Sequence, residues 1–354
     1  MRVPAGARLL AAMLLLCGFA GRPPRDDQPL AHYSASRISM ACEYAIDAYG
    51  RDADDLPRVL DEALDEADRI DRLMSHYRAD SPLSRVNREA ASRPVAVDQE
   101  LFDFIASALR YSRDSDGAFD VTVGPLMKTW GFFGGEGRVP SEREIADVVR
   151  RVGAAHVILD PARRTIAFDA AGVELDLGGI AKGYAVDRIV DIFRRRRIPA
   201  ALVSAGGSTI YALGAPPGRG AWPIAIQDPI DSRKTAFTLH VADRAVSVAG
   251  RSEKSFEEHG VVYSHIMDPR TGRPAQGVLA VVVLAPTGTD GDALDDAFFV
   301  LGPERSRAYA ARLRETEAMF LVPDSSRGWT LVPVRREAAG RSFPTDEDRR
   351  RHMS

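Results

Sequence analysis

Cysteine is nearly absent from this 354-residue chain, which has only Cys17 and Cys42. If Cys17 leaves with an N-terminal leader, Cys42 has no partner in the chain, so a fold stapled by disulfides is excluded. Cys42 is then expected to pack as a small hydrophobic side chain. Aromatic residues make up only 7% of the chain, but 45% of its residues are hydrophobic, which is enough for the core of one large or two modest domains.

The chain also lacks an excess of charge of either sign, because 47 Lys and Arg face 50 Asp and Glu. This balance excludes a broad positive surface, and nucleic acid is therefore not expected as a partner. The basic run Arg194–Arg197 is interpreted as the solvated C-terminal end of a helix. A compact anionic ligand could still be bound locally.

Long hydrophobic runs are missing as well. The apolar stretch Leu9–Cys17 is too short to cross a bilayer comfortably, and nothing downstream approaches the necessary length. Arg2 and Arg8 precede this stretch and small residues follow it up to Ala20, which is the order of a secretory signal. Residues 1–20 are therefore predicted to be a signal peptide, and the protein is expected to be periplasmic or otherwise extracytoplasmic.

Cys17 leaves a second possibility open at the N-terminus. It follows three leucines, as in a lipoprotein signal, although Leu16 stands where such signals usually carry a small residue. A lipidated Cys17 or an uncleaved signal would associate the protein with the inner membrane.

Composition and periodicity divide the rest of the chain into three parts. Residues 21–35 are predicted to be a flexible leader, because prolines and charges outnumber groups that could be buried. Residues 36–336 are predicted to form the folded domain, which begins with a strand over 37–50 and a long amphipathic helix over 52–77. The charged residues 337–354 are predicted to be a frayed tail.

Further helices and short strands follow within the folded domain. Helices are predicted over 98–115, over 141–153 after a capping pattern at Ser141, from Ala181 and from about Asp292. Strands are predicted at HVILD, TIAFD, AALVSAG, WPIAIQD, AFTLHVA, AVSVAG, VLAVVVLAP, EAMFLVP and WTLVPV. This order predicts an α+β fold with a largely antiparallel sheet.

Two segments place polar groups next to glycines. In Gly117–Gly135, Asp120 and Thr122 alternate with apolar residues, which predicts a strand with two polar groups on one face; a plain edge strand with a turn is the alternative. In Asp176–Asp187, a strand that ends in a carboxylate passes through two glycines into a helix with Lys182 in its first turn. Such a helix start suits phosphate oxygens, although the Walker A pattern is absent and a purely structural turn remains open.

Two later segments carry groups suited to proton transfer and metal binding. His265 stands three residues before Asp268, ahead of a turn, and a histidine held by local hydrogen bonds can act as a general base; a structural histidine is the alternative. Asp292 and Asp296 are four residues apart and share one face of the predicted helix. Their hard oxygen atoms suit Mg²⁺, while an acidic first helical turn without metal is the competing interpretation.

In this order the segments resemble the ApbE family of FAD:protein FMN transferases. The resemblance covers about residues 38–335 and rests on FDVTVGPL, WGF, DLGGIAKGYAVD, the glycine pair of VSAGGSTI, IQDP, HIMDPRTGRP and DALDDA. It implies a fold related to the T-fold proteins, with two subdomains around an FAD cleft and Mg²⁺ beside the pyrophosphate. FMN would pass from FAD to a Thr or Ser hydroxyl of a target protein through a phosphoester bond, with release of AMP.

The resemblance also implies roles for individual residues. The metal would be bound by the carbonyl of Gly179 and by Asp292 and Asp296. The catalytic group would consist of His265 as the base, together with Asp268 and Lys182. The residues in contact with the flavin nucleotide would be Met40, Tyr77, Ala118, Phe119, Asp120, Asp176, Lys182 and Ile266.

Five residues, in three segments, depart from the family pattern. Ala41 and Cys42 replace the Gly and Thr of a Met-Gly-Thr opening, and Val248 and Ala249 replace the first two residues of Thr-Ser-Gly. Asp296 stands where the family usually has a metal-binding threonine; it keeps an oxygen ligand and adds charge, so metal binding is predicted to be retained or tighter.

Two other functions remain open at this point. The same site could hydrolyse FAD to FMN and AMP with water in place of the acceptor hydroxyl. The changed residues also allow a noncatalytic periplasmic FAD-binding protein. For the transferase, the resemblance implies an acceptor flavoprotein of a respiratory or electron-transfer complex, which the sequence does not identify.

Overall fold

The computed structural model describes residues 29–134, 137–251 and 253–335. The predicted signal peptide at 1–20, including Cys17, and the predicted tail at 337–354 lie outside the described residues. Residues 29–35 are described, and the first strand already begins at Ala31. The flexible leader predicted for 21–35 is therefore wrong for its last five residues, which pair with a neighbouring strand.

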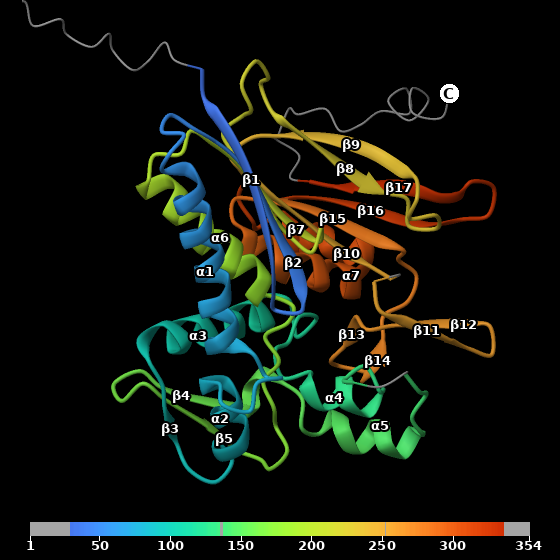
Figure 1. Ribbon diagram of the computed structural model, residues 1–354. Helices are drawn as coiled ribbons and strands as arrows, with labels where there is room; N and C mark the ends of the chain where they lie inside the picture. The colour runs from blue at the N-terminus through green and yellow to red at the C-terminus, as the bar shows by residue number, and fades with distance from the viewer. Residues whose placement is uncertain (1–28, 135–136, 252, 336–354) are drawn as a thin grey trace, which may run out of the picture.

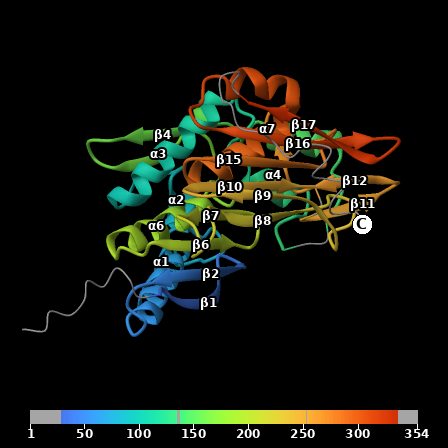
Figure 2. The same cartoon turned by 90° about the horizontal axis from the view of Figure 1, so that it is seen from above.

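An eight-stranded sheet forms the larger part of the fold, and each neighbouring pair in it is antiparallel. Figure 2 shows its order from β1 and β2 at one edge to β16 and β17 at the other. In spatial order the strands are β1 (Ala31–Ser39), β2 (Cys42–Gly50), β6 (Ala200–Ala205), β7 (Thr209–Leu213), β10 (Arg244–Gly250), β15 (Ala280–Ala285), β16 (Glu317–Asp324) and β17 (Gly328–Val334).

Both faces of this sheet are covered, which explains why its central strands are hydrophobic almost without interruption. On β15, Val281 and Val283 point into the main core, while Val282 points into a second cluster on the opposite face. The main core is shared with α1 (Leu56–Met74), α6 (Ala181–Arg195) and α7 (Gly288–Ala310). The second cluster is closed by the two-stranded ribbon of β8 (Trp222–Gln227) and β9 (Thr235–Val241).

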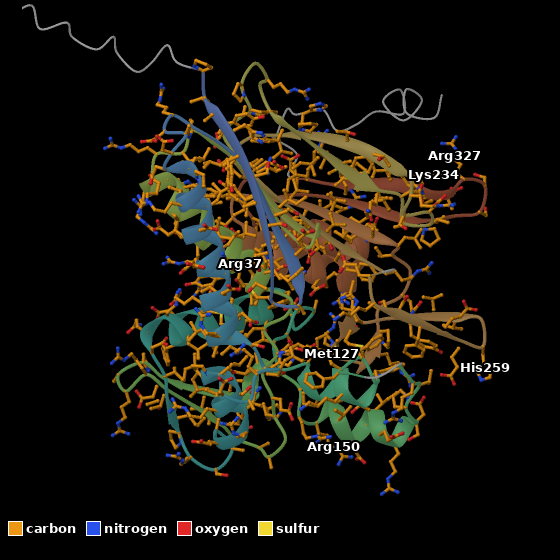
Figure 3. All side chains as sticks on the ribbon, in the orientation of Figure 1. Arg37, Met127, Arg150, Lys234, His259 and Arg327 are labelled. Carbon is orange, nitrogen blue, oxygen red and sulfur yellow. The ribbon has the colours of Figure 1, made fainter. Side chains whose placement is uncertain are left out.

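A smaller group of elements lies below the sheet in Figure 1. It contains the short sheet β3–β5–β4 and several helices, while two ribbons lie beside it. These elements are α2 (Pro82–Glu89), β3 (Val95–Ala96), α3 (Gln99–Asp114), α4 (Gly124–Thr129), α5 (Glu142–Val149), η2 (Ala154–His156), β4 (Val157–Asp160), β5 (Thr165–Phe168), β11 (Ser255–Glu258), β12 (Val261–Ser264), β13 (Met267–Asp268) and β14 (Arg273–Pro274). Figure 3 shows Met127 of α4 at the edge of this group that faces the sheet, whereas Arg150 and His259 lie at the periphery.

The predicted α+β class with a largely antiparallel sheet is confirmed. All five predicted helices are present, whereas α2 and α4 were not predicted. The capping pattern at Ser141 forms a complete capping box with Glu144. The long helix begins at Leu56, after the acidic run, with a proline in its first turn. The helix predicted from about Asp292 begins earlier, at Gly288, because the Thr287 side chain accepts a hydrogen bond from the backbone of Asp290.

Three predicted strands are wrong. The segment that ends at Asp176 is not a strand, and the backbone of Leu175 there exchanges hydrogen bonds with the side chain of Asn87. Residues 37–50 form a hairpin rather than one strand, and Met40 and Ala41 in its two-residue turn have φ of 50° and 60°. This is the backbone of a turn with two left-handed residues, which usually carries Asn or Gly and gave no signal here. The segment around Asp120 is a turn, because that carboxylate accepts hydrogen bonds from the backbone and hydroxyl of Thr122, at 2.8 and 2.6 Å, and from the backbone of Ala154.

Candidate functional site

A cavity of about 930 Å³ lies where the sheet, the start of α6, α7 and the smaller group of elements meet. Its wall is assembled from segments that are far apart in the sequence, including the β1–β2 turn and the end of α1. All the site residues predicted from the sequence line it, with the exception of Asp268. They are Met40, Tyr77, Ala118, Phe119, Asp120, Asp176, Gly179, Lys182, His265, Ile266, Asp292 and Asp296.

Asp268 is placed differently from its prediction. Its carboxylate accepts hydrogen bonds from the backbone of Arg270 at 3.0 Å and from the guanidinium of Arg270 at 2.8 and 2.9 Å. These contacts fix the turn between β13 and β14, and Asp268 does not line the cavity. The assignment of Asp268 to the catalytic group is corrected accordingly, since its position is that of a turn-stabilising residue.

Three carboxylates of one helix, α7, face the cavity. Asp292 accepts hydrogen bonds from the backbone N–H of Gly183 and from the hydroxyl of Thr209, both at 2.9 Å. Asp295, which the sequence analysis did not single out, accepts a hydrogen bond from Ser247 at 2.6 Å. The signal for Asp295 was present in the run of three acids in DALDDA, but helical spacing alone favoured the pair four residues apart.

Because these carboxylates are buried close to one another, their ionised forms are disfavoured. Burial and the charges of Asp296 and Asp292 hold the pKa of Asp295 well above its usual range. Burial, followed by the charge of Asp292, raises the pKa of Asp296 to about 7. Such a cluster gains stability from any positive charge that enters it.

The donor set fits a hard divalent cation. Oδ2 of Asp296 lies against the backbone of Gly179, because a Cβ atom added at Gly179 would come within 2.5 Å of it. Within the described ranges, no group of three or more His, Cys, Asp or Glu side chains is arranged to hold a metal, so the side chains alone do not complete a metal site. The Asp296 carboxylate accepts no hydrogen bond from the described residues and is free to act as a ligand. Two carboxylates and a carbonyl would suit Mg²⁺, which usually keeps water and phosphate oxygens as its other ligands.

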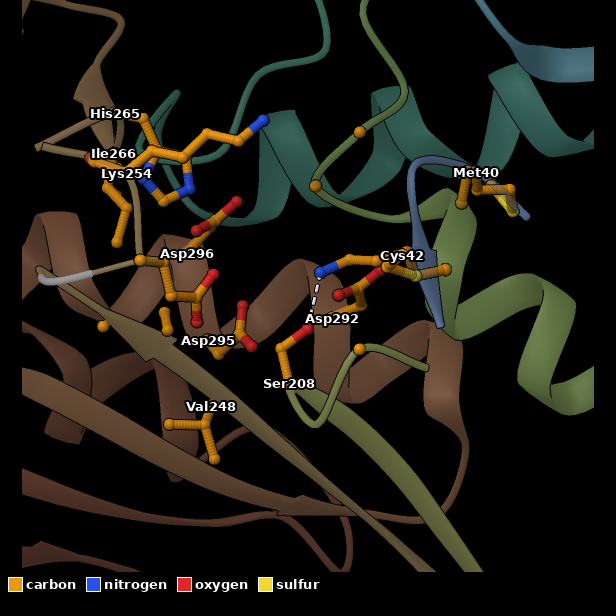
Figure 4. Close-up of a pocket in the computed structure, with 18 of the residues that line it drawn as sticks. Met40, Cys42, Ser208, Val248, Lys254, His265, Ile266, Asp292, Asp295 and Asp296 are labelled. Carbon is orange, nitrogen blue, oxygen red and sulfur yellow. Dashed lines mark hydrogen bonds between the residues drawn. The ribbon is translucent and has the colours of Figure 1, made fainter. Parts of the chain in front are cut away.

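Lys182 places a positive charge close to the α7 carboxylates. It lies in the first turn of α6, and its Nζ donates a hydrogen bond to Oγ of Ser208 at 2.6 Å, the dashed line in Figure 4. Burial lowers the pKa of Lys182, but the nearby carboxylates, Asp292 first, outweigh burial and raise it to about 12. The ammonium group is therefore charged at neutral pH, beside amides at a helix start, and this arrangement can bind phosphate oxygens.

His265 is present as a neutral imidazole at the same cavity. Its Nδ1 lies 3.2 Å from the carbonyl of Lys254. Because a carbonyl only accepts, Nδ1 carries the hydrogen and Nε2 has the free lone pair. Burial lowers the pKa of His265 to about 4, so the ring is uncharged at neutral pH. Figure 4 shows His265 close to Asp296 and Lys254.

The positions that depart from the family pattern also line the cavity. Cys42 on β2 lines the cavity, as do Val248 and Ala249 on β10. Burial raises the pKa of the Cys42 thiol. The residue is half-buried and packs against Gly206, close to its expected role as a small hydrophobic side chain. All five departing residues, including Ala41 and Asp296, thus line the wall where a bound ligand would meet them.

The combination of a fixed ammonium group, a cation-compatible carboxylate cluster and a neutral imidazole is that of a site for transfer at phosphorus. A model of the ApbE family matches residues 40–320. The chain is 33% identical over 333 residues to the FAD:protein FMN transferase of Treponema pallidum (strain Nichols), covering 90% of this chain and 91% of that protein. It is 30% identical over 336 residues to the FAD:protein FMN transferase of Escherichia coli (strain K12), covering 91% and 93%.

Solved structures give the same result. The ApbE protein of Thermotoga maritima superposes with a TM-score of 0.77 at 30% identity, covering 87% of this chain and 97% of that one. The flavinyl transferase ApbE of Pseudomonas stutzeri, in its apo form, superposes with a TM-score of 0.76 at 30% identity, covering 87% and 96%. The chain belongs to the ApbE family.

Proposed function

We propose that this protein is a Mg²⁺-dependent flavin transferase, which moves FMN from FAD to a Thr or Ser hydroxyl of an acceptor protein and releases AMP. The observation that carries the proposal is the presence of Lys182, the α7 carboxylates and a neutral His265 in one cavity. Membership of a family whose named relatives are FAD:protein FMN transferases supports it.

Lys182 and the backbone at the start of α6 would bind the pyrophosphate of FAD. The ammonium group is fixed by Ser208 and flanked by Asp292, so it stays charged and has little freedom to move. Gly179, Asp292 and Asp296 would hold Mg²⁺, which supplies charge neutralisation for the phosphoryl oxygens. Oriented charge in a site that excludes water is the main source of acceleration expected for such a transfer.

His265 would prepare the acceptor hydroxyl. Its Nε2 takes the proton as the hydroxyl oxygen forms a bond to the FMN-side phosphorus, while the bond from that phosphorus to the bridging oxygen breaks and AMP leaves. The carbonyl of Lys254 keeps the ring in the tautomer that can accept this proton. The flavin ring undergoes no change of oxidation state in this step.

The proposal includes where the protein acts and which kind of acceptor protein it modifies. The signal-like N-terminus supports export to the periplasm or another extracytoplasmic space, with a lipid anchor on Cys17 as the alternative. None of the helices in the described ranges is long and apolar enough to cross a membrane. The acceptor would be an exported or membrane-bound flavoprotein of an electron-transfer complex.

A product balance distinguishes this function from its alternatives. Purified protein, FAD and Mg²⁺ are incubated with and without an acceptor protein, and AMP, free FMN and acceptor-bound flavin are quantified by chromatography. Transfer predicts AMP and acceptor-bound flavin in equal amounts. AMP with an equal amount of free FMN would instead indicate a hydrolase, and intact FAD would indicate a noncatalytic flavin binder.

A further inference from the structure

His76, which the sequence analysis did not single out, lies in the cavity wall just after α1. Its side chain is only 12% exposed, and its Nδ1 lies 3.2 Å from Oδ1 of Asp176. The same Asp176 oxygen accepts a hydrogen bond from the backbone of Gly178 at 2.9 Å, so the carboxylate that orients His76 is itself fixed. His76 is therefore held in one orientation by the segment that leads into Lys182.

The second ring nitrogen of His76 lacks a partner. Nε2 is buried and makes no hydrogen bond to any residue in the described part of the chain. Because the carboxylate of Asp176 can only accept, the neutral ring carries its hydrogen on Nδ1, and Nε2 is then left as an acceptor. A buried polar atom without a partner is unfavourable, so a ligand that offers an N–H or O–H group to Nε2 gains affinity by satisfying it.

Aromatic rings beside His76 define the shape of that ligand. The ring of Tyr77 lies 4.0 Å from that of His76 and stacks on Phe133 at 4.7 Å, with only 6° between the ring planes. Tyr77 also lines the cavity and is 58% exposed, so a face of this stacked pair is available to another planar ring. A heterocycle with a hydrogen-bond donor on its edge matches both features.

We propose that His76 is a substrate-binding residue, whose Nε2 accepts a hydrogen bond from the FAD ring system that stacks on Tyr77. The inference rests on the proposed function, in which FAD is the substrate. Both ring systems of FAD, the adenine and the isoalloxazine, carry N–H donors at their edges. The hydrogen bond adds to the affinity for FAD and takes no part in the transfer step.

The test compares His76→Phe, which keeps an aromatic ring and loses both nitrogens, with the unaltered protein. The dissociation constant of FAD is measured by calorimetry, and the melting temperature and the single-turnover rate at saturating FAD are recorded alongside. We expect about a tenfold rise in the dissociation constant, an unchanged or higher melting temperature and an unchanged rate. If His76→Phe does not fold, His76→Leu, which also has no hydrogen-bond acceptor, is measured against the same expectation for FAD affinity.

The matched control is His32→Phe, which removes a histidine 3.3 Å from Asp47 on the edge hairpin, outside the cavity wall. It should leave FAD affinity unchanged. ADP and FMN are then titrated separately, and the one that loses affinity in His76→Phe identifies the ring system involved. The inference is overturned if His76→Phe loses affinity for neither ADP nor FMN, or if its FAD affinity stays within twofold of that of the unaltered protein. Either result leaves the proposed function standing. Failure of the unaltered protein to bind FAD would contradict the proposed function itself.

Discussion

The carboxylate of Asp292 accepts a hydrogen bond from the backbone N–H of Gly183 at 2.9 Å. This bond joins α7, which carries the acidic cluster, to the first turn of α6, which carries Lys182. The two helices approach so closely here that a Cβ atom at Gly183 would overlap the carbonyl oxygen of Gly288. The position of the ammonium group relative to the carboxylates is therefore set by backbone contact between two helices.

Gly183→Ala is expected to lower the free energy of unfolding by about 3 kcal/mol, because the added methyl group must push α6 and α7 apart. Thermal or urea unfolding measures this change. Gly220→Ala is the matched control, since nothing lies within 4 Å of a Cβ atom there. Equal stabilities of the two variants would contradict the close helix contact.

In the turn between β1 and β2, replacement of an alanine by glycine is expected to stabilise the protein. Ala41 has φ of 60°, a conformation that costs a residue with a Cβ atom about 1–2 kcal/mol. Ala41→Gly is expected to raise the free energy of unfolding by up to about 1 kcal/mol, after the entropy of glycine in the unfolded chain is subtracted. Ala45→Gly, in the extended strand β2, should instead destabilise the protein, and a gain there would refute the backbone argument.

These contacts show which features the sequence could predict. Helical periodicity and the Ser141 capping pattern predicted five of the helices, because both signals are local. The short helices α2 and α4 were not predicted. The turn at Ala41 was missed, since it contains neither Gly nor Asn. His76 was missed for another reason: its partner Asp176 is 100 residues away in the sequence, and no local pattern reports such a contact. The family motifs, in contrast, placed Lys182 and the α7 carboxylates in one cavity.

The acidic cluster predicts a pH-dependent affinity for Mg²⁺. Burial raises the pKa of Asp296 to about 7, and a metal binds only the ionised carboxylate. Affinity should therefore fall as the pH decreases through about 7. Asp296→Asn should bind Mg²⁺ at least about tenfold more weakly at pH 8 and lose the fall in affinity that is centred near pH 7. Calorimetric titration measures both effects.

Glu304→Gln serves as the control for that titration, because Glu304 lies on α7 with a side chain 83% exposed. Its Mg²⁺ affinity should equal that of the unaltered protein at every pH. A loss of affinity in Glu304→Gln equal to that in Asp296→Asn would show that helix charge in general, rather than Asp296, attracts the ion.

The low pKa of His265 predicts the pH profile of the transfer step. A base acts in its neutral form, which for a pKa of about 4 is complete at neutral pH and is lost only as the pH falls through about 4. With FAD and Mg²⁺ saturating, the single-turnover rate should be level between about pH 6 and 8. Half-loss of the rate near pH 6.5, the ordinary pKa of histidine, would contradict burial as the dominant influence on His265.

The measurement that tests the central claim most directly is the intact mass of an acceptor protein after incubation with FAD and Mg²⁺. The unaltered enzyme should add the mass of one FMN to the acceptor, and His265→Ala should add none at the same concentration, although it still binds FAD. Replacement of the acceptor threonine by alanine should also abolish the gain. Flavin attachment at an unchanged rate by His265→Ala would contradict the assignment of His265 as the base, and an acceptor of unchanged mass with the unaltered enzyme would contradict the transferase.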